Sequence, residues 1–122
     1  MKNQIRPQPG QLIKEKCTAC RADSPAVSDE EVKILLPVVM DWKLIEENGT
    51  KKLDRSFRFS TFKDAMAFTS KIASLAEDEG HHPRIVTEWG AVRVTWWTHK
   101  IRNLHRNDFL MAIKSTDIFN NL

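Results

Sequence analysis

The chain has 122 residues, 41% of them hydrophobic and 29% charged, which fits a soluble globular protein with a single core. It has no apolar run near the ~20 residues of a membrane span and no apolar centre of a secretory signal, so we expect a cytoplasmic protein with no membrane partner. A net charge of +3 is too small to indicate nucleic acid as a partner.

The first sixteen residues are polar and show no hydrophobic periodicity. Chain termini of this kind are usually poorly ordered unless something ties them down. We therefore expect a flexible N-terminal segment over residues 1–16 and one folded domain over residues 17–122.

Two cysteines, Cys17 and Cys20, form a C-x-x-C spacing at the start of that domain. A zinc site of the Cys₄ or Cys₂His₂ kind needs a second pair of ligands, and the chain has no second cysteine pair. A redox motif is expected at a strand-to-helix junction, whereas this pair precedes the first predicted helix. We expect two reduced, non-catalytic thiols.

A short helix and a β-hairpin are the first regular elements expected along the chain. Ser28 followed three residues later by Glu31 is a capping box, and Pro37 ends or kinks the helix because proline has no N–H to donate. The dipeptide Asn48-Gly49 favours a two-residue turn, so residues 41–60 are predicted to form a hairpin.

The longest predicted helix follows, with Ser60 or Thr61 as its N-cap and Gly80 as its C-terminal cap. Two strands over residues 84–89 and 91–99 then alternate apolar and polar side chains around Gly90. A last helix is predicted over about residues 106–117, with its apolar residues at helical spacing.

This element order, α-β-β-α-β-β-α, predicts an α+β fold. Four antiparallel strands with the helices segregated to one side form a two-layer sandwich. We expect a four-stranded antiparallel sheet with three helices on one face.

Histidines are concentrated at one end of the predicted sheet. If the two strands after Pro83 pair around Gly90, the register brings His81 and His82 close to His99. Imidazoles donate and accept protons near neutral pH, so two of them beside a small substrate form an acid and a base.

Two other interpretations of these histidines stay open from the residues alone. A histidine pair after a helix end often caps the last carbonyl groups of that helix. Three histidines also form a known kind of zinc site, although adjacent residues in an extended segment point in different directions.

The spacing around the histidines fits a family signature. It consists of an acidic residue, His-His-Pro four positions later, an aromatic residue, a further histidine and an aspartate in the last helix. The matching residues are Glu77, His81-His82-Pro83, Trp89, His99 and Asp108. Over residues 17 to about 117 the sequence resembles the bacterial branch of the pterin-4a-carbinolamine dehydratase family, with flanking text such as "FRFSTFKDAMAFT" and "TEWGAVRVTWWTHKI".

This resemblance implies a fold, an activity and a set of functional residues. The family fold is a four-stranded antiparallel sheet with three helices on one side, and its members need no metal and no cofactor, the pterin being the substrate. The implied reaction dehydrates 4a-hydroxytetrahydrobiopterin to quinonoid dihydropterin. By resemblance, His81 and His99 transfer protons, and His82 binds and orients the pterin.

The remaining signature positions are expected to support substrate binding. Glu77 and Asp108 are the acidic positions of the family, and Asp108 is expected to orient a histidine or contact the pterin, or else to serve the first turn of its helix. Trp89 is expected either to form a wall of the site or to lie in the core.

The resemblance also implies partners. The reaction restores the cofactor of phenylalanine hydroxylase, so a functional link to that enzyme is expected. Family members form dimers or tetramers, and the edge strands of an open sheet invite pairing, so we expect a homodimer. The alternative function is a non-catalytic interaction or dimerisation protein similar to a transcriptional coactivator, because animal members of the family bind a transcription factor.

Overall fold

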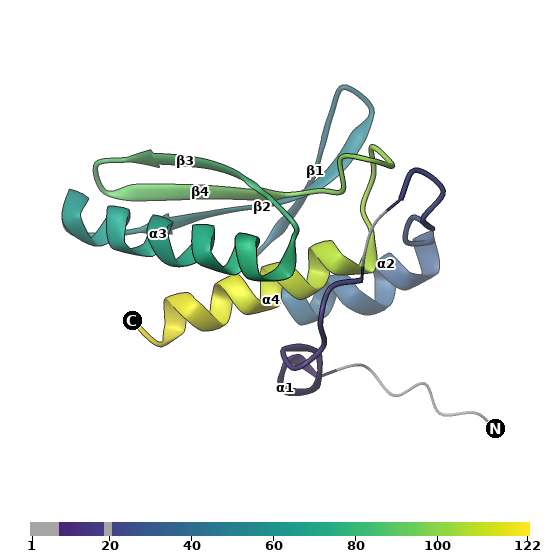
Figure 1. The fold of residues 1–122 in the computed structure, drawn as a ribbon, viewed down its shortest axis with the longest axis horizontal. Coiled ribbons are helices and arrows are strands. Elements are labelled where there is room, and N and C mark those ends of the chain that lie inside the picture. The colour runs from purple at the N-terminus through teal and green to yellow at the C-terminus, as the bar shows by residue number, and fades with distance from the viewer. Residues whose placement is uncertain (1–7, 19–20) are drawn as a thin grey trace.

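The structure, a computed structural model, describes residues 8–18 and 21–122. In these ranges the element order is α1 (Pro9–Leu12), α2 (Asp29–Leu35), the 3₁₀ helix η1 (Leu36–Val39), β1 (Lys43–Glu47), β2 (Thr50–Arg58), α3 (Phe62–Glu79), β3 (Arg84–Glu88), β4 (Ala91–Trp96) and α4 (Arg106–Asn120). Figure 1 shows the sheet as one layer and α2, α3 and α4 together on one side of it.

The described strands form one antiparallel sheet in the order β1-β2-β4-β3. The β1–β2 hairpin closes at Asn48 and Gly49, whose φ angles of 52° and 80° are those of a type I′ turn. Gly90, also at positive φ, closes the β3–β4 hairpin. The predicted α+β two-layer architecture is confirmed.

Both predicted helix starts are observed. Ser28 and Glu31 make the reciprocal bonds of a capping box at the start of α2, and the Thr61 side chain accepts the Asp64 N–H at the start of α3. The α-helical hydrogen bonds of α2 give way to the 3₁₀ helix η1 at Pro37, where the missing N–H interrupts the pattern.

The core lies between the inner face of the sheet and the helices α3 and α4. Alternate residues of β4 point inward and are fully buried, as the period of a half-buried strand requires. The largest side chains that are fully buried among the described residues are Trp96, Phe57, Phe68 and Phe109. Three of the aromatic rings of this region, those of Phe57, Phe68 and Phe119, lie within 6 Å of one another.

Part of the N-terminal segment that was expected to be flexible is helical. The described part of the chain contains four α-helices, and the additional one is α1, in the segment that was expected to be flexible. Leu12 is buried in the core, and Glu15 forms an ion pair with Arg106 of α4, 2.8 Å between Oε2 and Nε. Isolated apolar residues in a polar segment give no periodic signal, which is why the sequence did not predict α1. Residues 1–7 lie outside the described residues.

The strand β4 is three residues shorter than predicted. It ends at Trp96, and Thr98 then pairs with Asn103 in an isolated bridge that closes a turn. Along residues 97–99 the buried side chain of Thr98 still lies between two more exposed ones, but these residues are no longer paired with β3. This turn carries His99.

Candidate active site

The end of α3 fixes the direction of His81. Gly80 adopts a left-handed conformation with φ 64°, and the backbone N–H of His81 donates to the carbonyl of Ala76, 3.1 Å. A backbone hydrogen bond that spans five residues across a left-handed glycine is the six-to-one bond of a Schellman motif. The helix stop therefore aims the histidine that follows it.

A buried carboxylate on α4 meets His81. The imidazole Nε2 lies 2.6 Å from Oδ1 of Asp108, which is fully buried, and His81 itself is only 7% exposed. The second oxygen, Oδ2, accepts the hydroxyl of Thr98 at 2.8 Å and the backbone N–H of His105 at 2.9 Å. Asp108 thus orients a histidine with one oxygen and caps α4 with the other.

This contact sets the tautomer of His81. An ionised carboxylate has only acceptors, so Nε2 of His81 carries the hydrogen in the bond to Asp108. Nδ1 is then the nitrogen that can take up or release a proton. The imidazole ring also stacks on Trp96, with the ring planes 9° apart and the centroids 5.7 Å apart, which limits its rotation.

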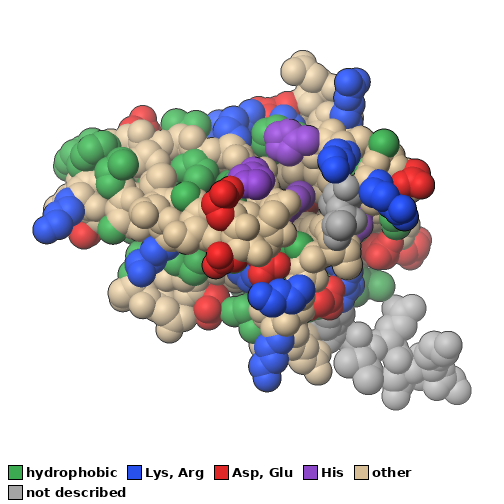
Figure 2. Space-filling model, in the orientation of Figure 1, with side chains coloured by type: hydrophobic (Ala, Val, Ile, Leu, Met, Phe, Trp, Pro, Cys, Tyr) green, Lys and Arg blue, Asp and Glu red, His purple; other side chains and the backbone are tan. Residues whose placement is uncertain are grey.

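His82 faces the opposite way. Its Nε2 is hydrogen-bonded to Oε2 of Glu77 on the last turns of α3, and both side chains are exposed. The residue before a proline is held in extended geometry, so Pro83 separates the directions of the two neighbouring histidines. Figure 2 shows histidine surface gathered in one region of the molecule, with acidic surface beside it.

His99 lies on the turn that follows β4. Extending the β3–β4 register beyond Arg84 and Thr95 puts His81 opposite Thr98 and His82 opposite Trp97. The three histidines therefore lie toward the same end of this hairpin. The imidazole of His99 is exposed, and its centroid lies 4.4 Å from the ring of Trp97.

Trp89 is not brought to the histidines within one chain. It lies in the turn between β3 and β4, at the other end of the hairpin, and is 74% exposed. It is therefore outside the core as well. Trp97, the residue after β4, lies beside His99. Sequence reasoning did not assign it to the site, although its place two residues before His99 on the outward face was a signal for it.

His105 is a further histidine next to the site. As the N-cap of α4 it accepts the Asn107 N–H through Nδ1 at 3.0 Å, and burial lowers the pKa of His105 below its usual 6.5. The nearby charges are Asp108 and Glu31, which oppose that shift, and His81, which adds to it. Histidine is an unusual N-cap, so the capping box of His105 with Asp108 did not stand out in the sequence.

Cys17 lies between the end of α3 and the start of α4. Its backbone N–H donates to Oε1 of Glu79 at 2.9 Å, and its thiol contacts the carbonyl of Asn107. Burial, with the charge of Glu79, raises the pKa of the Cys17 thiol to about 12. Its partner in the C-x-x-C spacing, Cys20, lies outside the described residues.

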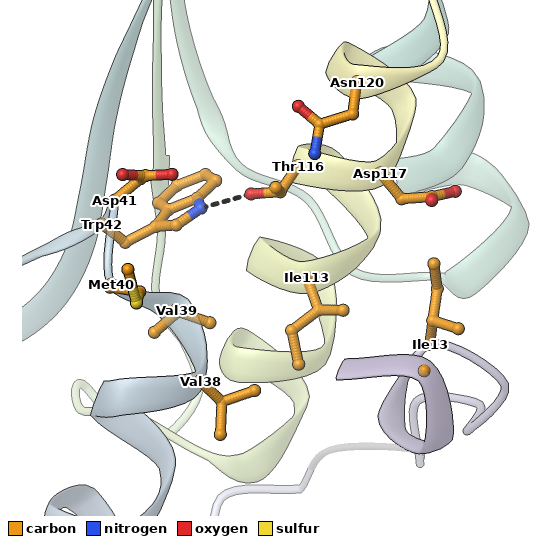
Figure 3. A pocket seen from close by; sticks show the side chains of 11 residues that line it. Ile13, Val38, Val39, Met40, Asp41, Trp42, Ile113, Thr116, Asp117 and Asn120 are labelled. Carbon is orange, nitrogen blue, oxygen red and sulfur yellow. Dashed lines mark hydrogen bonds between the residues drawn. The ribbon is translucent and has the colours of Figure 1, made fainter. Parts of the chain in front are cut away.

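One cavity lies away from the histidines. A cavity of about 340 Å³ between η1, α4 and the segment after α1 is lined by apolar side chains and by Asp41 and Asp117, and Figure 3 shows the indole N–H of Trp42 donating to Thr116 beside it. None of the signature residues lines this cavity. Over residues 8–18 and 21–122, no group of three or more His, Cys, Asp or Glu side chains is arranged to hold a metal ion.

No helix in the described ranges combines the length and the apolarity needed to span a membrane.

Comparison with known proteins matches residues 25–118 to the model of one family, described as pterin 4 alpha carbinolamine dehydratase. A protein of Saccharophagus degradans with the provisional name pterin-4-alpha-carbinolamine dehydratase is 47% identical over 108 residues, which is 88% of this chain and 96% of that protein. A protein of Nitrosococcus oceani with the same provisional name is 50% identical over 103 residues, covering 84% of this chain and 91% of that protein.

Two solved structures share the fold. A transcriptional coactivator/pterin dehydratase from Brucella melitensis superposes with a TM-score of 0.70 and 29% identity over 77% of this chain and 98% of that chain. A pterin dehydratase-like protein identified as a RuBisCO assembly factor in the alpha-carboxysome has a TM-score of 0.55 at 20% identity, over 64% of this chain and 88% of that chain, which is a likeness of fold alone.

Proposed function

Because this chain belongs to the pterin-4-alpha-carbinolamine dehydratase family, a family of hydro-lyases, we propose that it converts 4a-hydroxytetrahydrobiopterin to quinonoid dihydropterin by histidine acid–base catalysis. The observation that carries this proposal is the buried pair of His81 and Asp108 at the hairpin end that also holds His82 and His99. Family membership supplies the reaction, and this geometry supplies the groups that transfer the protons.

The reaction needs one acid and one base. The bond between C4a and its hydroxyl oxygen breaks as that oxygen receives a proton and leaves as water. A ring nitrogen loses its proton, and the electron pair of that N–H bond forms the new double bond. Each assisted proton transfer contributes ~10²–10⁴ in rate, so two imidazoles of suitable protonation supply much of the catalysis.

We assign the two proton transfers to His81 and His99. His81 is suited to this because Asp108 fixes its orientation and its tautomer. His82, held by Glu77 at the exposed side of the site, binds and orients the pterin. Trp89 receives no role within one chain, since it lies at the other end of the hairpin.

Neither a metal nor a cofactor is part of the proposed reaction, because imidazoles alone supply an acid and a base. The purified protein should accelerate the loss of the 4a-hydroxypterin formed in a phenylalanine hydroxylase assay without added metal. Activity that disappears with a chelator and returns with a metal ion would contradict this part of the proposal.

The assignment of the histidines is tested in the same assay. His81→Ala and His99→Ala should each remove most of the rate, whereas Cys17→Ser should keep it, because the Cys17 thiol is protonated and its hydrogen-bond partner is the Asn107 carbonyl, not a histidine. Wild-type rates in both histidine variants would contradict acid–base catalysis by these residues.

The proposed setting is a cytoplasmic homodimer that serves phenylalanine hydroxylase. The strands β1 and β3 are the two edges of the sheet and offer unpaired backbone groups to a second copy. Sedimentation velocity measures the oligomeric state directly, and a monomer at micromolar concentration would contradict the dimer.

A second candidate function is binding to a protein partner without catalysis. The Brucella melitensis neighbour bears both a coactivator and a dehydratase name, and this chain exposes Met66 and Trp89. The histidine variants separate the two functions, because a binding role does not need His81 or His99.

A further inference from the structure

The ring of Trp97 is contacted by side chains from β2, from β3 and from the turn after β4. The imidazole of His99 lies 4.4 Å away, centroid to centroid, with the planes 36° apart. The ammonium of Lys52 on β2 lies 3.9 Å from the indole centroid, and the guanidinium of Arg84 on β3 lies 5.4 Å from it. Cations at these distances are attracted to the face of an indole, so the ring is restrained from two strands.

Those two cations are themselves fixed by one carboxylate. Oε1 of Glu47 accepts Nζ of Lys52 at 2.9 Å and Nη2 of Arg84 at 3.0 Å. These hydrogen bonds lower the pKa of Glu47, so it stays ionised. Lys52 is only 8% exposed, which is unusual for a lysine and shows that its ammonium does not move freely in solvent.

His99, in contrast, lacks the support that His81 has. His81 is buried and bonded to Asp108, whereas His99 is exposed on the turn after β4. The next residues make a tight turn in which Arg102 N donates to the His99 carbonyl at 3.3 Å, which holds the backbone but not the side chain. In the described part of the chain, the aromatic ring in contact with the His99 imidazole is that of Trp97, tilted by 36° from it.

We propose that Trp97, restrained by Lys52 and Arg84, is the positioning residue that holds the imidazole of His99 in its reactive orientation. This inference rests on the proposed function, which assigns a proton transfer to His99. An exposed side chain must lose conformational entropy to reach its reactive orientation. Contact with a restrained ring orders the side chain before the reaction, so this entropy cost no longer adds to the barrier.

The kinetic test replaces Trp97 by Leu and by Phe. Trp97→Leu should lower kcat by roughly 2- to 12-fold, the change that one aromatic contact produces, with KM nearly unchanged. Trp97→Phe keeps an aromatic face and should recover most of the loss. Phe62→Leu is the matched control, since it removes an exposed aromatic ring on the first turn of α3 and should keep kcat.

The double variant with His99→Ala decides whether Trp97 acts through His99. In that background Trp97→Leu should have no further effect on kcat. An equal loss of kcat with and without His99, or a rise in KM alone, would overturn the inference and indicate that Trp97 contacts the substrate directly or only stabilises the fold.

A measurement without substrate keeps the inference separate from the proposed function. The imidazole C–H resonances of His99 should shift toward their unfolded-chain positions in Trp97→Leu, because the ring current of the indole is lost. Lys52→Met, which frees the indole, should shift them in the same direction by less. Unchanged resonances in both variants would overturn the inference, whereas full activity of His99→Ala would overturn the proposed role of His99 and leave the resonances shifted.

Discussion

Asp108 shows how one side chain can cap a helix and also hold a candidate catalytic histidine. Its Oδ2 completes the cap of α4 through the His105 N–H, and its Oδ1 binds Nε2 of His81. The hydroxyl of Thr98 supplies a third donor. A fully buried carboxylate is stable only with such donors, so the donors that satisfy the charge also fix the direction of the histidine.

Asp108→Asn should lower kcat by about 10²-fold, because an amide of the same shape no longer enforces the Nε2–H tautomer of His81. Steady-state kinetics in the hydroxylase-coupled assay measure the loss. Thr98→Val leaves the contact between Asp108 and His81 in place and should lose far less. Equal rates for Asp108→Asn and wild type would show that His81 needs no carboxylate partner.

The lowered pKa of His105 gives stability a defined pH dependence. The unfolded histidine titrates near 6.5 and the folded one below it, so as pH falls below 6.5 the unfolded state takes up the proton first and the free energy of unfolding decreases. His105→Asn keeps a capping side chain without the titration. Between pH 7 and pH 5, the free energy of unfolding measured in urea should fall more for wild type than for His105→Asn. An equal fall in both proteins would contradict the lowered pKa of His105.

At the scale of elements, helix ends build the site. The C-terminal stop of α3 delivers His81 and His82, and the N-terminal cap of α4 delivers His105 and Asp108. The β3–β4 hairpin adds His99 through the turn after β4. Each group of side chains therefore follows or begins a helix or strand whose end is fixed by neighbouring residues in the sequence.

Gly80→Ala tests the role of the α3 stop. No atom lies within 4 Å of the added methyl group, so the cost is the left-handed conformation itself, roughly 1–2 kcal/mol of stability. Gly49→Ala in the β1–β2 turn is the matched control, with φ 80° and the same open space. Urea unfolding should show similar losses of stability, whereas kcat should fall only for Gly80→Ala, because that change redirects His81. A fall of equal size in both would refute the link.

At the scale of the whole molecule, the N-terminal segment joins the two helices of the site. Thr18 and Asn107 exchange two hydrogen bonds, 3.0 Å and 2.8 Å, and Cys17 binds Glu79 of α3. Asn107 is almost fully buried, so its two bonds to Thr18 are partly shielded from water. The segment around Cys17 and Thr18, for which the sequence predicts no helix or strand, therefore connects the end of α3 to the start of α4.

The Cys17 thiol reports on the opening of this region. With a pKa of about 12 it holds little thiolate at pH 8, so in a Cys20→Ser background iodoacetamide should alkylate it roughly 10³-fold more slowly in the folded protein than in urea. Mass spectrometry of timed samples measures the two rates. Equal rates would mean that Cys17 is neither buried nor shifted in solution.

The sequence by itself determined most of the elements and the family. Capping boxes, the Asn48-Gly49 turn and strand alternation are local signals, and they predicted the α+β sandwich correctly because each depends on neighbouring residues. The spacing from Glu77 to Asp108 predicted the family and brought His81, His82 and His99 to one end of the sheet, since a hairpin register follows from its turn.

Only the tertiary structure decided how those residues divide their contacts. Trp89 is exposed in the turn at the other end of the hairpin. Asp108 packs against His81, α1 packs against the core, and Lys52 and Arg84 contact Trp97, each across segments far apart in the chain. Contacts of this kind depend on how the sheet and the helices pack, and local patterns carry no information about that packing.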